Sequence, residues 1–73
     1  MIYVVYVQGY DEKRNPIGFD QKVDYIVKYQ EAERRFLTKH CKVPEYVPHA
    51  TLYLEKRDKV GRFVALIRAK EVK

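Results

Sequence analysis

The sequence has 73 residues, enough for one small domain (1–73), and 15 Lys and Arg against 10 Asp and Glu give it a net charge of +5. Its one cysteine excludes an internal disulfide and favours a reducing compartment, since secreted domains of this size normally carry several bridges. No apolar run approaches the roughly 18 residues of a membrane span, and the N-terminus lacks signal-peptide features. We therefore expect a cytoplasmic protein with no membrane partner.

The first expected strand, from Ile2 to Tyr10, is apolar on both of its alternating sets of residues. One set contains Ile2, Val4 and Tyr6, and the other contains Tyr3, Val5 and Val7. Such a pattern is typical of a strand whose two faces are both covered. A polar segment with Asn15-Pro16 as turn initiator follows, and an extended pattern resumes at Ile17 as the second strand of a hairpin.

The stretch from Lys22 to Cys41 decides the fold, because it can form one long helix or a strand that runs into a short helix. In the helical interpretation, the apolar stripe is interrupted by four polar residues: Gln30, Glu33, Arg34 and His40. In the other interpretation, alternating Val23, Tyr25, Val27 and Tyr29 form a half-buried strand. We prefer the strand, followed by a helix of about three turns from near Gln30 to Cys41.

The buried stripe of this shorter helix is predicted to contain Ala32, Phe36, Leu37, His40 and Cys41. On its exposed side, Glu31 precedes Arg35 by four residues, the favourable order for an ion pair.

An extended connection containing Pro44 and Pro48 follows the helix, then strands from Ala50 to Arg57 and from Arg62 to Val72. The prediction is an α+β fold, a small β-β-α-β-β antiparallel sheet with one helix packed on one face. The alternative is β-α-β-β with one long helix from Gln21 to Cys41. No internal repeat is visible, and we expect the two hairpins to differ in length and loop chemistry.

One short helix covers only one face of such a sheet, yet the first and last strands are apolar on both faces. We therefore expect a homodimer that buries the second face, since a two-fold contact also stabilises a small domain. The predicted interface residues are Tyr3, Val5, Val64 and Leu66. A heterologous protein partner on the same face is the alternative.

Residues that carry chemistry form no recognisable site. His40, Cys41 and His49 do not match the ligand spacing of a zinc site. The pairs Asp11-Glu12 and Glu31/Glu33 are expected to be solvated, and no glycine-rich phosphate loop is present. We therefore expect no enzyme activity, no cofactor and no bound metal.

Basic residues cluster on the expected helix exterior and at the two hairpin ends, where they could contact the phosphates of RNA or DNA. These candidate nucleic-acid-binding residues are Lys13, Arg14, Arg34, Arg35, Lys39, Lys42, Lys56, Arg57, Lys59 and Arg62. Exposed Tyr25, Tyr46 or Tyr53 would stack on bases. The predicted function is that of a small basic, non-enzymatic regulatory or accessory protein, although such cations also serve as a solubilising surface.

The alternative function is that of a protein-binding modulator, for example a viral or mobile-element protein that docks on host machinery. Seven tyrosines in so short a chain favour this alternative, because tyrosine is enriched at protein interfaces. Docking would use a tyrosine-rich sheet face or strand addition at a sheet edge.

Overall fold

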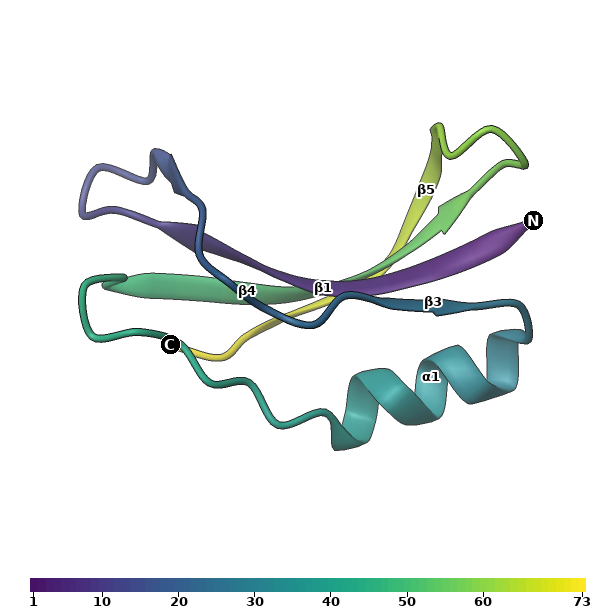
Figure 1. Ribbon diagram of the computed structural model, residues 1–73, viewed down its shortest axis with the longest axis horizontal. Coiled ribbons are helices and arrows are strands. Elements are labelled where there is room, and N and C mark those ends of the chain that lie inside the picture. The colour runs from purple at the N-terminus through teal and green to yellow at the C-terminus, as the bar shows by residue number, and fades with distance from the viewer.

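The computed structural model describes all residues, 1–73, as an antiparallel sheet with one helix packed on one face (Figure 1). The elements in chain order are β1 (Ile2–Tyr10), β2 (Pro16–Ile17), β3 (Asp24–Ile26), α1 (Tyr29–Thr38), β4 (His49–Arg57) and β5 (Phe63–Glu71). The predicted α+β fold is confirmed, with the expected second strand divided into β2 and β3. The alternative of one helix from Gln21 to Cys41 is wrong, and the helix that does form is not long and apolar enough to span a membrane.

The sheet order is β2-β1-β4-β5, and β3 pairs with β1 on the same edge as β2. Between these two short strands, the Gln21 carboxamide takes the place of a strand backbone. Its Nε2 donates to the Val7 carbonyl at 2.5 Å, and its Oε1 accepts from the Val7 N–H at 2.7 Å. The outer edge of β1 is thereby covered along most of its length, while β5 remains a free edge.

The extended segment ends before Tyr29 because that residue forms the first turn of α1. Its hydroxyl donates to the Glu33 carboxylate at 2.8 Å, and its ring packs edge-on against Tyr3 with centroids 5.5 Å apart. Lys28 is extended and caps the helix without a side-chain bond, and Val27 is 75% exposed. The predicted alternation from Val23 to Tyr29 therefore corresponds to only three paired residues, Asp24–Ile26.

The core lies between α1 and the sheet face formed by the odd-numbered residues of β1. Its seven buried residues are Val5, Val7, Ala32, Phe36, Ala50, Leu52 and Leu54. Assigning Val5 and Tyr3 to an uncovered interface is therefore wrong. Val5 is 0% exposed in this core, and Tyr3 packs against its margin, so the helix already covers this face.

The predicted buried stripe of the helix is only partly correct. Ala32 and Phe36 are buried, but Leu37 is 58% exposed, because the next residue after Phe36 points about 100° away from the sheet. The helix ends at Thr38, so exposed His40 and half-buried Cys41 lie in the following connection. The ion pair expected between Glu31 and Arg35 is not formed, and Glu33 pairs instead with Arg68 of β5 at 3.2 Å.

The same five-residue turn closes both hairpins, so the prediction that their loops differ in chemistry is wrong. Asp11 and Asp58 each accept, through Oδ1, backbone N–H bonds from residues two and four positions later, at 2.8–2.9 Å. The fourth residue of each turn has a left-handed backbone, with φ of 68° at Arg14 and 92° at Gly61. The pKa of each aspartate is lowered below its usual range, mainly by a backbone hydrogen bond, from the Asn15 N–H to Asp11 and from the Arg62 N–H to Asp58.

This repetition predicts opposite effects at the two equivalent positions. Replacing Arg14 by Gly should stabilise the protein by up to about 1 kcal/mol, because a left-handed backbone is unfavourable for a residue with a Cβ. Replacing Gly61 by Ala should destabilise it by about 1 kcal/mol, although no atom lies near the added Cβ. Urea denaturation followed by circular dichroism measures both changes. Equal signs for the two substitutions would contradict this explanation.

Candidate nucleic-acid interface

Charge is distributed unevenly across the sheet. We define the tyrosine face as the sheet face away from α1, together with the two hairpin turns, which curve to that side (Figure 1). The charges on the tyrosine face cancel, with five basic residues against five acidic ones. They are Lys13, Arg14, Arg57, Lys59 and Arg62 against Asp11, Glu12, Glu55, Asp58 and Glu71.

The remaining charged residues lie on the helix side, where ten basic residues face five acidic ones. Strand register places Lys56, Arg68 and Lys70 there, because they pair with Tyr3, Leu54 and Leu52, respectively. The other residues belong to α1, to the segments that flank it in the chain or to the C-terminus, and we count them with the helix side: Lys22, Lys28, Arg34, Arg35, Lys39, Lys42 and Lys73 against Asp20, Asp24, Glu31, Glu33 and Glu45. The excess of five equals the whole net charge of +5, so the entire positive excess lies on the side of the helix.

Three adjoining hollows follow the seam between α1 and the segment 19–26, with volumes of about 350, 300 and 240 Å³. Arg35 and Thr38 line both the first and the second, while Lys22, Lys39 and His40 line both the second and the third. We refer to these hollows together as the basic groove. Its lining cations are Lys22, Arg34, Arg35, Lys39 and Lys42, and its carboxylates are Asp20, Asp24 and Glu31.

The sequence predicts Lys39 as an outward-facing cation on the helix exterior. In the structure, its side chain is instead buried in the wall of the basic groove. Its ammonium group lies 2.7 Å from the Asp24 carboxylate, and both side chains are only 10% exposed. It also donates to the Lys22 carbonyl at 2.5 Å. Lys39, the extended residue that caps the C-terminus of α1, thus joins the end of the helix to β3 and to the segment that precedes β3.

Ion pairs also engage two predicted cations on the other side of the sheet. Arg57 bonds Glu55 at 3.1 Å, and Arg62 bonds Asp58 at 3.0 Å. By contrast, Arg34, Arg35 and Lys42 are exposed and form no ion pair.

The structure therefore does not bring the ten predicted basic residues together. It gathers Arg34, Arg35, Lys39 and Lys42 at the basic groove and leaves Lys13, Arg14, Arg57, Lys59 and Arg62 on the tyrosine face, with Lys56 on β4 outside the groove. Lys22 is the lining cation that sequence reasoning missed. Only the approach of residues 19–22 to the end of α1 reveals it, and the sequence carries no signal of that approach.

The tyrosines of the sheet face are held by hydrogen bonds. Tyr6 donates to Glu55, the Tyr10 and Tyr53 hydroxyls are 2.6 Å apart, and the Tyr6 and Tyr53 rings have centroids 5.5 Å apart. Burial and the bond to Glu55 raise the pKa of Tyr6, and the bond to Tyr53 raises the pKa of Tyr10 to about 12. These rings are fixed on the sheet, so Tyr53 is less suited to base stacking than expected, whereas Tyr25 and Tyr46 are 64% and 65% exposed.

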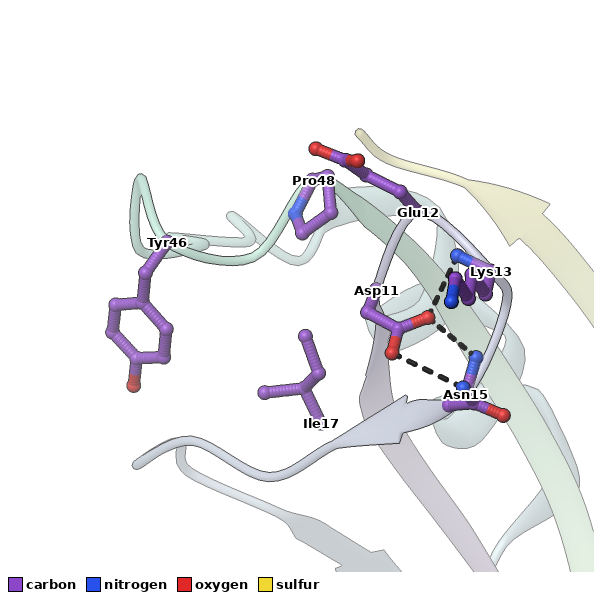
Figure 2. A pocket seen from close by; sticks show the side chains of 7 residues that line it. All are labelled: Asp11, Glu12, Lys13, Asn15, Ile17, Tyr46 and Pro48. Atoms are coloured by element: carbon purple, nitrogen blue, oxygen red, sulfur yellow. Dashed lines mark hydrogen bonds between the residues drawn. The ribbon is translucent and has the colours of Figure 1, made fainter.

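The largest hollow, about 440 Å³, lies between the first hairpin turn and Tyr46 (Figure 2). Among the lining residues, the Asp11 carboxylate is the candidate for a general base, and Figure 2 shows it directed at Lys13 and Asn15. Both Asp11 oxygens accept hydrogen bonds within the turn, at 2.8 Å from two backbone N–H groups and 3.3 Å from the Asn15 amide. The carboxylate thus stabilises the turn, and no partner that would activate it as a base lines the hollow.

No three His, Cys, Asp or Glu side chains gather where they could hold a metal ion. The fold and the groove together define a small α+β protein with one positively charged side. No protein-family model, curated protein or solved structure matches the chain.

Proposed function

We propose that this is a small, non-enzymatic regulatory or accessory protein that binds RNA or DNA, with phosphates lying in the basic groove. The observation that carries the proposal is the location of the whole positive excess on the helix side, around a groove with exposed arginines. Such an excess attracts polyanions at long range, and neutralised phosphates release counterions on binding. The tyrosine face has no comparable excess.

The groove favours contact with the nucleic-acid backbone over reading of bases. Arg34 and Arg35 are adjacent on α1 and line the groove together, while Lys22 and Lys42 line its other end. Guanidinium groups suit phosphate oxygens, but phosphate contacts carry no sequence information. With up to about four phosphates neutralised, the logarithm of the association constant should fall with log salt at a slope of roughly −3.

The test compares two double charge reversals in titrations of a labelled single-stranded oligonucleotide at about 50 mM salt. Arg34→Glu with Arg35→Glu alters the groove, and Lys13→Glu with Arg14→Glu alters the first hairpin turn by the same charge. We expect the groove variant to lose at least about tenfold in affinity, and the hairpin variant to lose less than about threefold. A larger loss in the hairpin variant, or wild-type affinity no better than millimolar, would overturn the proposal.

A separate observation supports the alternative of a protein-binding modulator. Phe63, Val64 and Leu66 at one end of β5 are 61%, 44% and 50% exposed and carry no charge. Apolar surface at a sheet edge suits a protein partner better than a polyanion. Binding by this surface would weaken little between about 50 and 200 mM salt, whereas binding by the groove would weaken steeply.

A further inference from the structure

Two of the seven tyrosines have rings that are free to stack on a ligand. The other five are engaged within the chain by a hydrogen bond or a ring–ring contact: Tyr3, Tyr6, Tyr10, Tyr29 and Tyr53. Tyr25 and Tyr46 form neither contact, and they are 64% and 65% exposed. A ring without an internal partner can stack on a nucleic-acid base at no loss of contacts in the fold, so these two are the candidates for base stacking.

Of these two tyrosines, Tyr25 is the one beside the basic groove. It is the middle residue of β3, and both of its neighbours line the groove, Asp24 in the second hollow and Ile26 in the first. Tyr46 lies instead in the separate hollow of Figure 2, where two carboxylates accompany one lysine. Carboxylates repel phosphates, so a nucleic acid held in the groove is placed to meet Tyr25 and not Tyr46.

The Tyr25 side chain and the groove lie on opposite sides of one edge strand. Because side chains alternate along a strand, Asp24 and Ile26 are directed to the helix side, and Tyr25, which pairs with Val4, is directed to the other side. β3 has only three residues and pairs with β1 alone, so no strand lies outside it. A nucleic-acid backbone in the groove can therefore send a base round the edge of β3 to the Tyr25 ring.

We propose that the nucleic acid bound in the basic groove is single-stranded and that one of its bases stacks on the Tyr25 ring. The inference rests on the proposed function and narrows its ligand to unpaired RNA or DNA. In a duplex the bases are paired and stacked on one another, so a protein ring has no access to their faces. Every base has a π-face, and stacking therefore adds affinity without sequence preference, as expected beside a groove that contacts phosphates.

Phosphate contacts and base stacking respond differently to salt. The groove cations set the slope of the logarithm of affinity against log salt, whereas the Tyr25 ring carries no charge and releases no counterion. Replacing Tyr25 by Ala should therefore lower the affinity at every salt concentration and leave the slope unchanged. Charge reversal at Arg34 and Arg35 should reduce the slope itself.

Titrations of a labelled DNA strand of about 12 nucleotides, alone and paired with its complement, test the proposal at about 150 mM salt. We expect the wild type to bind the single strand more tightly than the duplex. Tyr25→Ala should lose at least about fivefold in affinity for the single strand and less than about twofold for the duplex. Tyr25→Phe keeps the ring and removes only a hydroxyl without a partner, so it should stay within about twofold of the wild type.

Tyr46→Ala is the matched control, because it removes the same ring from a position of almost equal exposure. It should lose less than about twofold in affinity for the single strand. Equal losses in Tyr25→Ala and Tyr46→Ala, or a wild type that binds the duplex as tightly as the single strand, would overturn the inference.

The ring-proton NMR signals of the wild type supply a readout that needs no variant. A base stacked on the Tyr25 ring should move its signals upfield as the single strand is added, while the Tyr46 signals stay in place. Tyr25 signals that do not move at saturating DNA would also contradict base stacking.

The Arg34→Glu, Arg35→Glu variant separates this inference from the proposed function. If that variant loses affinity as expected and Tyr25→Ala does not, the groove binds nucleic acid but Tyr25 does not stack on a base. If that variant binds the single strand as tightly as the wild type, the groove is not the binding site and both proposals are overturned.

Discussion

Replacing Val5 by Lys is expected to abolish folding, with a loss of about 4 kcal/mol or more. Val5 is 0% exposed between the sheet and α1, so the substitution would bury an unpaired ammonium group in the core. A domain of this size has a total stability of only about 5 kcal/mol. Circular dichroism and urea denaturation measure the effect.

Val64→Lys is the matched control, because it makes the same substitution, valine to lysine, at a position where the side chain is 44% exposed. It should retain the wild-type urea midpoint to within about 0.5 kcal/mol in the unfolding free energy. A folded Val5→Lys variant with a midpoint close to wild type would contradict the placement of the helix over this face of β1.

Removing the Asp24 carboxylate is the second substitution with a large expected effect. Asp24→Ala should destabilise the protein by about 3 kcal/mol, because it leaves the Lys39 ammonium group, 10% exposed, without its counter-charge. Glu33→Ala is the control, since its partner Arg68 is 46% exposed and exposed pairs contribute about 1 kcal/mol or less. Chemical denaturation at neutral pH compares the two. If Asp24→Ala were no worse than Glu33→Ala, Lys39 would not join the helix to β3 as described.

Local pattern was sufficient for most of the fold. Apolar residues on both alternating sets predicted β1 with its observed bounds, Ile2–Tyr10. The polar interruptions of a long stripe favoured a strand and a short helix over one helix from Gln21, and the structure has the short helix. The division of the second strand was not predictable in this way. The gap between β2 and β3 depends on one side chain, because the Gln21 carboxamide bonds the Val7 backbone where a strand would otherwise pair. A single side chain that takes the place of a strand backbone leaves no periodic pattern in the sequence.

Both faces of β1 are covered near Val4 without a partner chain. Val4 on the tyrosine face is 1% exposed within the single chain, with Tyr25 and Glu55 as its neighbours on the adjacent strands. Large amphipathic side chains on a curved sheet can bury a valine without a second layer. The exposed apolar surface lies instead on β5, where Val64 and Leu66 were predicted.

The candidate site was predicted in residue type but not in arrangement. Arginines at positions 34 and 35 were expected on the helix exterior, and they line the basic groove. Helix periodicity alone could not reveal that Lys39 turns back to Asp24 or that the hairpin turns curve away from the helix (Figure 1). Both features depend on tertiary contacts between segments far apart in the chain.

The central claim is that nucleic acid binds in the basic groove. An NMR titration of ¹⁵N-labelled protein with a short single-stranded oligonucleotide at about 50 mM salt tests this claim most directly. The largest amide shift changes are expected at Lys22, Arg34, Arg35 and Lys42, with little change at Lys13 and Lys59. Changes concentrated at the hairpin turns or on the tyrosine face would contradict the assignment of the basic groove as the nucleic-acid interface.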